Sequence, residues 1–223
     1  MSTAISNWSG FLLLLLDGAW VTLQLTVAGC CIALVGAFIL GLCRLSRWAA
    51  LRWFATAYIE FFRGSSIFVQ LFWAYFVLPL AGFPLEPMAT GILVLGLNVS
   101  AFGAEVVRGA ILAVPKEQFE TAVALNLTPY QRMRHVILPQ AIVFMLPTFG
   151  NNAIELLKAT AVVSLISLSD LTFQAQVIRL QTGNTAVPFI GALLIYFVIS
   201  VIISRGVRHL ETRLSDGLDV TKH

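Results

Sequence analysis

The stretch AWVTLQLTVAGCCIALVGAFILGLC, residues 19–43, decides the fold class, because it runs for 25 residues without a charged side chain. A membrane-spanning helix needs about 20 consecutive apolar residues, so this stretch is long enough to cross a bilayer. Four further stretches have a similar length and apolar character. The sequence therefore predicts an all-α integral membrane protein with five spans, at about 19–43, 55–80, 88–110, 141–168 and 187–206.

The composition of the whole chain agrees with a membrane protein. Apolar residues make up 58% and charged residues 11% of the 223 residues, against about 45–50% and about 25% in soluble domains. Mean hydropathy is +0.88. Side chains this apolar do not cover a water-exposed globule, which excludes a soluble enzyme and a disordered chain. A net charge of +3 is too small for a phosphate-binding surface, so no nucleic-acid partner is expected.

The N-terminal segment and the cysteines carry weaker signals. The apolar run at 11–16 is too short to cross the membrane and stops at Asp17-Gly18, so residues 1–18 are expected to form an interfacial segment. No basic residue precedes this run, which argues against a cleaved signal peptide. The three cysteines have neither CxxC nor Cys/His spacing, so neither a metal site nor a disulfide is expected.

The basic residues predict the orientation. Eleven of the 14 lysines and arginines follow the first span, lie between the third and fourth spans, or follow the fifth. Short loops rich in lysine and arginine remain in the cytoplasm. We therefore expect the N-terminus outside and the C-terminus in the cytoplasm, with residues 211–223 as a cytoplasmic tail.

The large cytoplasmic loop, 112–140, carries signals for two short helices. Pro115 suits the first position of one helix, and acidic residues follow it. Asn126 stands where a left-handed C-cap would end that helix. Thr128 and Gln131 have capping-box spacing, which begins a second helix. Pro139 either ends this second helix or marks entry to the fourth span. Such a helix pair could lie on the membrane surface or dock in a groove of a partner.

Polar residues inside the spans mark a second group of candidates. Asn151, Glu155 and Lys158 fall on one face of the fourth span, at i, i+4 and i+7. Intramembrane polar residues often line a transport pathway, although they also hydrogen-bond between helices and stabilise packing. The candidates for a solute path are Gln70, Asn98, Glu105, Asn151, Asn152, Glu155 and Lys158. Glu60 and Arg63 are expected instead to form a structural pair.

Several motifs resemble one family of transporters. Glu120-Thr121-Ala122, Asn126 and the stretch VILP at 136–139 resemble the EAA loop of ABC-importer permeases. The stretches TLQLT at 22–26, FRGSS at 62–66 and LLKAT at 156–160 resemble further motifs of the polar amino-acid group of these permeases. Together these similarities cover about residues 18–210.

The resemblance implies the type I ABC-importer permease fold, with 19–210 as the permease domain and no catalysis of its own. It implies a bacterial cytoplasmic membrane protein that works with a dimer of ATPase subunits, which hold ATP and Mg. A second permease subunit and an extracytoplasmic solute-binding protein are the other implied partners. Residues implied at the ATPase contact are Glu120, Thr121, Ala122, Asn126, Leu138 and Pro139.

Some positions depart from the usual motifs. Thr121 and Asn126 replace the usual Ala and Gly, and Ser65-Ser66 replaces Thr-Pro, which removes a helix-breaking ring from the second span. These departures resemble the ectoine/hydroxyectoine branch, so ectoine and a polar amino acid both stay open as the solute. The alternatives outside this family are an ATPase-independent channel or ion-coupled carrier, and an intramembrane enzyme. No internal repeat favours a carrier, and no G-x-S-x-G or H-E-x-x-H motif favours an enzyme.

Overall fold

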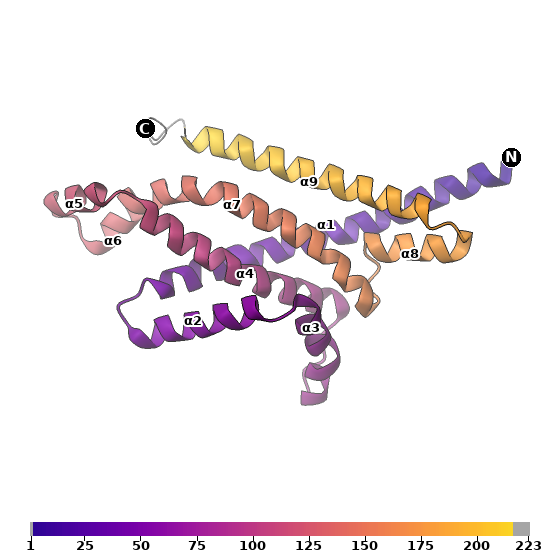
Figure 1. The fold of residues 1–223 in the computed structure, drawn as a ribbon, viewed down its shortest axis with the longest axis horizontal. Helices are drawn as coiled ribbons and strands as arrows, with labels where there is room; N and C mark the ends of the chain where they lie inside the picture. Colours follow the sequence, from indigo (N-terminus) through magenta and orange to yellow (C-terminus); the bar gives the residue numbers. More distant parts are fainter. Residues whose placement is uncertain (1, 216–223) are drawn as a thin grey trace.

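The computed structural model describes residues 2–215, with side chains from 10 to 214, and its regular structure in this range is helical. Four long helices, α1, α4, α7 and α9, run along the long axis of the molecule (Figure 1). The α-helices are α1 (Ser2–Arg44), α2 (Ala49–Gly64), α3 (Ile67–Phe72), α4 (Pro87–Ala113), α5 (Lys116–Ala124), α6 (Pro129–Arg132), α7 (Leu138–Ala159), α8 (Leu171–Thr182) and α9 (Ala186–Ser215). Two π turns, η1 (Trp73–Val77) and η3 (Met133–Ile137), and two 3₁₀ segments, η2 (Leu78–Ala81) and η4 (Thr160–Ile166), complete the described part.

The prediction of an all-helical membrane protein is confirmed. Within the described residues, four helices are long and apolar enough to cross a membrane: Gly10–Arg44, Pro87–Ala113, Pro129–Ile166 and Ala186–Leu214. A bent pair, Ala49–Gly64 with Ile67–Ala81, makes a fifth candidate.

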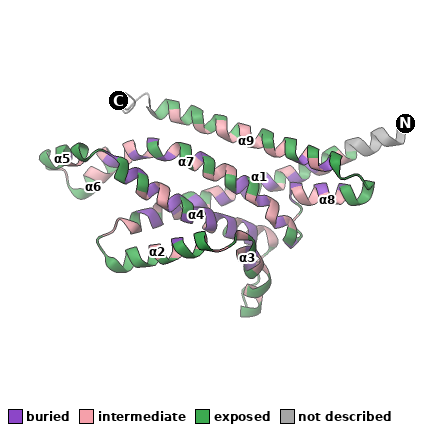
Figure 2. Ribbon diagram, in the orientation of Figure 1, coloured by how far each residue is buried: buried purple, intermediate pink, exposed green. Residues whose placement is uncertain are grey.

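Helix α4 lies at the centre of the bundle, and most of its residues are buried, whereas α9 exposes much of its surface (Figure 2). Helix α4 packs closely along α1 because small residues line the contact between these two helices. A Cβ atom added at Gly36 would lie 2.7 Å from the Cβ of Ser100, and one at Gly103 would lie 2.7 Å from the Cβ of Ala37. Glycine at these positions lets the two backbones approach, as is usual between membrane helices.

The expected break after the N-terminal segment is absent. Helix α1 continues through Asp17 and Gly18 into the first span, so residues 2–18 do not form a separate helix. A Cβ atom at Gly18 would lie 2.8 Å from the Cα of Leu171 and 2.9 Å from the carbonyl oxygen of Asp170. Gly18 therefore allows α8 to cross close to α1, and it does not end a helix. At the other end α9 continues past residue 210 to Ser215, and the rest of the expected tail, 216–223, lies outside the described residues.

The span predicted at 55–80 is bent at a break and is not one continuous helix. Ser65 and Ser66 are extended, with ψ of 151° and 129°, and the chain bends by 102° between α2 and α3. Two side-chain amides stabilise the break, because Gln70 Nε2 and Asn98 Nδ2 each donate to the Phe62 carbonyl at 3.1 Å. The chain thus turns here without the proline ring.

The fourth span begins further towards the loop than expected. Segments α6, η3 and α7 follow one another without interruption, and Pro129–Ile166 forms one helix of 38 residues. Pro139 has no N–H to donate to the His135 carbonyl, and this carbonyl lies in the π turn, where Leu138 N donates to Met133 O. The proline therefore sits within the helix instead of ending it.

A short helix also occupies the loop after the fourth span. The carboxylate of Asp170 caps α8 by accepting from the backbone N–H groups of Thr172 at 3.1 Å and Phe173 at 3.0 Å. Gly183, with φ of 69°, ends the helix in the left-handed conformation. Both signals are local, and the sequence analysis overlooked them.

Candidate functional site

The two short loop helices, α5 and α6, form a bent tip at one end of the bundle (Figure 1). Asn126 has a φ of 57°, which confirms the predicted left-handed cap. Thr128 N donates to Gln131 Oε1 at 2.9 Å, and Gln131 N donates to Thr128 Oγ1 at 3.3 Å, so the predicted capping box is present. Pro115 is the residue before the first helical position, not the first position itself.

The coupling tip, residues 115–132, exposes both polar and apolar side chains. Glu120 and Thr121 are exposed, whereas Ala122 is only 1% exposed and packs inward. Leu138 and Pro139 are half-buried in the long helix. Three large apolar side chains are also exposed on this surface, Val123, Leu125 and Tyr130, which are 53%, 68% and 68% exposed. An apolar patch of this kind beside a carboxylate is typical of a protein contact surface.

A second site lies between α2, α4 and α7. This polar cavity, of about 360 Å³, brings together three of the predicted solute-path residues, Asn98, Asn152 and Glu155. Its remaining lining residues are Phe62, Arg63, Ser65, Ile67, Val99, Phe102 and Ala159.

Arg63 places a cation on the wall of the polar cavity, although the sequence analysis predicted a structural pair between Glu60 and Arg63. Its guanidinium lies 5.4 Å from the ring centroid of Phe102, and the described part of the chain gives it no carboxylate partner. The expected Glu60–Arg63 pair is therefore not formed. Glu155 lines the same cavity from α7, so a cation and an anion come from different helices around one space.

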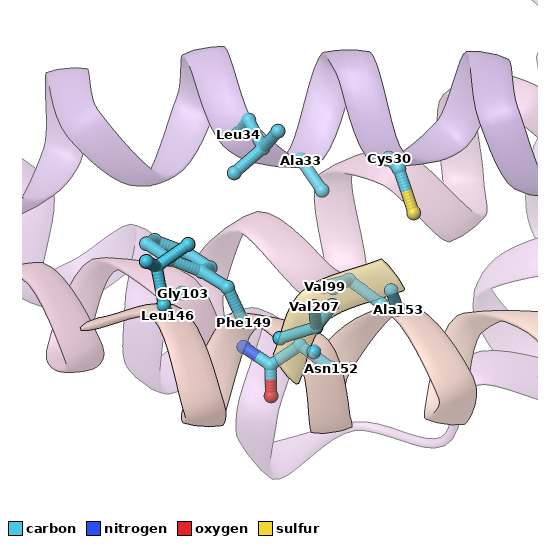
Figure 3. Close-up of a pocket in the computed structure, with 11 residues that line it drawn as sticks. Cys30, Ala33, Leu34, Val99, Gly103, Leu146, Phe149, Asn152, Ala153 and Val207 are labelled. Carbon is cyan, nitrogen blue, oxygen red and sulfur yellow. The ribbon is translucent and has the colours of Figure 1, made fainter. Parts of the chain in front are cut away.

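Asn152 borders a further cavity with different chemistry. This apolar cavity, of about 230 Å³, lies between α1, α4, α7 and α9, and Figure 3 shows Asn152 beside Phe149 and Val207 on the side away from Leu34. The Asn152 Nδ2 atom is buried and has no hydrogen-bond partner in the described part of the chain. A buried amide without a partner is costly, so this N–H group is suited to donate to a ligand.

The remaining solute-path candidates lie outside the polar cavity. Gln70 is engaged with Ser65 and Phe62 at the helix break, and Asn151 is exposed on the surface of α7. Lys158 pairs with Glu155 at 3.0 Å but lines a separate cavity with Thr172 and Tyr196. Glu105 pairs with Arg44 at 3.3 Å and Arg108 at 3.0 Å and is not among the residues lining the cavity.

Comparisons with known proteins agree with this architecture. A model of the family described as "Binding-protein-dependent transport system inner membrane component" matches residues 33–216. Over 215 residues, 94% of this chain and 90% of the relative, the sequence is 43% identical to "Probable amino-acid ABC transporter permease protein y4tF" of Sinorhizobium fredii. It is 36% identical to "Probable glutamine ABC transporter permease protein GlnM" of Bacillus subtilis, over 96% of this chain and 97% of the relative.

Solved structures share the fold. "Crystal structure of an amino acid ABC transporter with histidines" aligns with a TM-score of 0.86 at 34% identity, over 95% of this chain and 97% of that chain. A chain of the MetNI methionine ABC transporter in an inward-facing conformation aligns with a TM-score of 0.77 at 22% identity, over 91% of this chain and 97% of that chain.

Proposed function

The chain belongs to the family of inner membrane components of binding-protein-dependent transport systems, and we propose that its polar cavity forms part of the path of a zwitterionic solute. It is the permease subunit of an amino-acid ABC importer, a multi-pass membrane protein and not an enzyme. ATP hydrolysis belongs to a separate subunit of the complex, and we propose that ATP and Mg are bound there.

The presence of both Arg63 and Glu155 on the wall of one cavity is the observation that carries the proposal. A zwitterion presents a carboxylate and a cationic group. The planar guanidinium of Arg63 is suited to the carboxylate, because it offers two parallel N–H donors. Glu155 is suited to the cationic group, and Asn152 lines the same cavity.

The printed names of the relatives favour a polar amino acid as the solute. One similar permease is described as a glutamine transporter and another as an amino-acid transporter. Ectoine is also a zwitterion of similar size, so the charges of the cavity suit both. The resemblance of Ser65-Ser66 and Asn126 to the ectoine branch is the support for ectoine.

The solute is identified by uptake in cells that carry this permease with its neighbouring transport genes. Labelled glutamine and labelled ectoine are compared, with histidine, arginine, glutamate and hydroxyectoine as unlabelled competitors and a permease deletion as control. Glutamine uptake that the deletion abolishes and amino acids inhibit would support an amino-acid importer. Ectoine uptake that amino acids do not inhibit would assign a compatible solute instead, and loss of neither in the deletion would contradict the transport proposal.

The exposed polar face of α7 supports a second permease subunit as partner. Thr148, Asn151, Glu155 and Lys158 are all exposed on this membrane helix. Charged and amide groups do not face lipid hydrocarbon at low cost, so in the membrane another protein surface or a water-filled path must cover them. We propose that the second permease subunit covers this face, that the ATPase contacts the coupling tip, and that the solute-binding protein docks at the opposite end.

A further inference from the structure

The turn between α1 and α2 gathers more positive charge than its neighbours neutralise. Arg44, Arg47 and Arg52 lie on or beside this turn, and Arg108 of α4 joins them through Glu105. Glu105 is the single carboxylate that pairs with any of these arginines in the described part of the chain. Glu105 thus neutralises charge on Arg44 and Arg108, and no ion pair among the described residues neutralises the other two arginines.

Hydrogen bonds connect the arginines across the turn. Arg44 Nη1 donates to Thr56 Oγ1 at 2.8 Å, and Thr56 Oγ1 donates to the Arg52 carbonyl at 2.7 Å. The Arg52 guanidinium itself reaches back over the turn to the Ser46 carbonyl at 3.4 Å. Arg47 and Arg52 are both exposed and have no carboxylate partner among the residues described. Their charge is available to an external anion.

Exposed aromatic side chains surround these two arginines. Trp48 and Trp53 are 74% and 75% exposed, and Phe54 and Phe61 continue the exposed apolar surface along α2. Tryptophan favours the boundary between lipid headgroups and acyl chains, so it marks the depth of the membrane surface. The arginines therefore lie at headgroup level, at the start of an apolar helix face that extends into the bilayer.

We propose that this α1–α2 corner, formed by Arg47, Trp48, Arg52 and Trp53, binds the phosphate headgroup of an anionic phospholipid. The guanidinium groups donate to the phosphate oxygens, and the acyl chains lie along the exposed apolar face of α2. Basic residues beside a membrane surface favour anionic lipids over neutral ones. The predicted topology places the corner in the cytoplasmic leaflet. This lipid site goes beyond the transport function and is independent of the solute carried.

Quenching of tryptophan fluorescence by brominated lipids tests the site in the purified full-length permease bound to its ATPase. Trp8, Trp20 and Trp73 are first replaced by phenylalanine, so that Trp48 and Trp53 are the tryptophans of this chain that report, and the signal of the ATPase alone is subtracted. We expect brominated phosphatidylglycerol to quench at lower lipid fractions than brominated phosphatidylcholine. The Arg47→Gln/Arg52→Gln variant should lose at least fivefold of this preference, since each arginine near a membrane surface contributes about fivefold.

Two further variants separate a specific site from general charge. Arg205→Gln/Arg208→Gln removes the same charge from α9 on the same predicted side and should keep the preference. The Arg47→Lys/Arg52→Lys variant keeps the positive charge and should retain most of the preference for phosphatidylglycerol. Equal loss in the α9 variant, no loss in the Arg47→Gln/Arg52→Gln variant, or abolition by excess inorganic phosphate would each overturn the proposal. Gel filtration checks folding, and the single Gln variants replace the double variant if it aggregates.

Discussion

Glu155 combines two contacts that belong to different functions. Its carboxylate accepts from Lys158 Nζ at 3.0 Å on the surface of α7, and the residue also lines the same polar cavity as Arg63. An ion pair this exposed, with side chains 70% and 62% accessible, contributes little to stability in a single subunit. We therefore expect Glu155 to act in the polar cavity, and not through its ion pair with Lys158.

The Glu155→Gln substitution should weaken the apparent affinity of the transporter for its solute. The amount of permease inserted into the membrane should be unchanged. Loss of a charged partner for the solute's cation costs about 1–3 kcal/mol, so the half-saturating concentration should rise by about fivefold to a hundredfold. Uptake kinetics in proteoliposomes measure this value. Lys158→Gln is the matched control, since it breaks the same ion pair without changing the polar cavity. Equal effects of the two substitutions would contradict a solute contact at Glu155.

Asp170 is a titrating group in the loop after the fourth span. Its side chain is buried at 0% exposure beside the hydroxyl of Tyr196. Burial raises the pKa of its carboxyl from 3.8 to about 6, against the opposing effect of the Phe173 and Thr172 N–H groups. The folded chain therefore holds this proton more tightly than the unfolded chain.

The melting temperature should consequently fall as pH rises from about 4 to above 6. Stability from this carboxyl is full below its unfolded pKa of 3.8 and is lost as pH passes its folded pKa of about 6. The loss is on the order of 2–3 kcal/mol. Asp170→Asn keeps an N-cap acceptor and should remove this component, as thermal melting in detergent would reveal. The exposed Asp17→Asn should retain it, and identical pH profiles for the parent and Asp170→Asn would contradict the assignment.

At the scale of elements, the coupling tip is built from interactions within a few residues. The Asn126 cap and the Thr128–Gln131 box fix the bend between α5 and α6. This bend presents Glu120 beside the exposed apolar side chains of Val123 and Leu125. The surface is well suited to an ATPase contact in which Glu120 is the polar anchor.

Glu120→Arg should uncouple transport from ATP hydrolysis without preventing membrane insertion. Its charge reversal places a cation where the proposed contact needs an anion. Uptake and solute-stimulated ATPase activity of the assembled complex should both fall by at least tenfold, an effect of about 1.4 kcal/mol or more. Glu117→Arg on the same helix, also exposed, controls for the helix-dipole effect, worth about 0.3–1 kcal/mol. Normal uptake by Glu120→Arg at normal expression would exclude the coupling role.

Gly18→Ala should loosen the contact between α1 and α8. An added methyl group would lie within 3 Å of the Leu171 backbone, so the helices must separate. We expect a melting temperature several degrees lower, because overpacking typically costs about 1–3 kcal/mol. Gly10→Ala, in the same helix with nothing within 4 Å of the added atom, should be neutral or stabilising. A similar melting temperature for both variants would show that the crossing tolerates a side chain.

The difference between local and distant interactions explains which features could be predicted. Caps and capping boxes act over three or four residues, so the bend at Asn126 was visible in the sequence. The break at Ser65–Ser66 depends on Asn98, which is 36 positions from the Phe62 carbonyl that it binds. Arg63 meets Phe102 only because α2 packs on α4. Hydropathy locates spans but carries no information on such contacts.

At the scale of the whole molecule, the topology stays a prediction from the distribution of charge. The coupling tip and the turn after α1 carry basic residues, whereas the loop holding α8 carries only Arg179. The positive-inside rule therefore places the tip in the cytoplasm and α8 outside.

Thiol labelling in intact cells should confirm this orientation. In a variant whose native cysteines are replaced, Gln181→Cys should react with a membrane-impermeant maleimide, and Gln118→Cys should react only after the cells are opened. Both positions are exposed in this chain, so their labelling reports the side of the membrane on which each lies. The reverse labelling pattern would invert the topology and move the proposed lipid site to the outer leaflet.

The helix from Pro129 to Ile166 is continuous, so a rotation at its loop end moves its far end as well. At a rise of about 1.5 Å per residue, Glu155 lies roughly 24 Å along the axis from Pro139. A tilt of about 5° at the π turn would displace Glu155 sideways by roughly 2 Å, which is comparable to the radius of a side-chain group. One continuous helix therefore connects the surface proposed to contact the ATPase with the wall of the polar cavity, and a small rotation at the π turn would produce a larger displacement at the cavity.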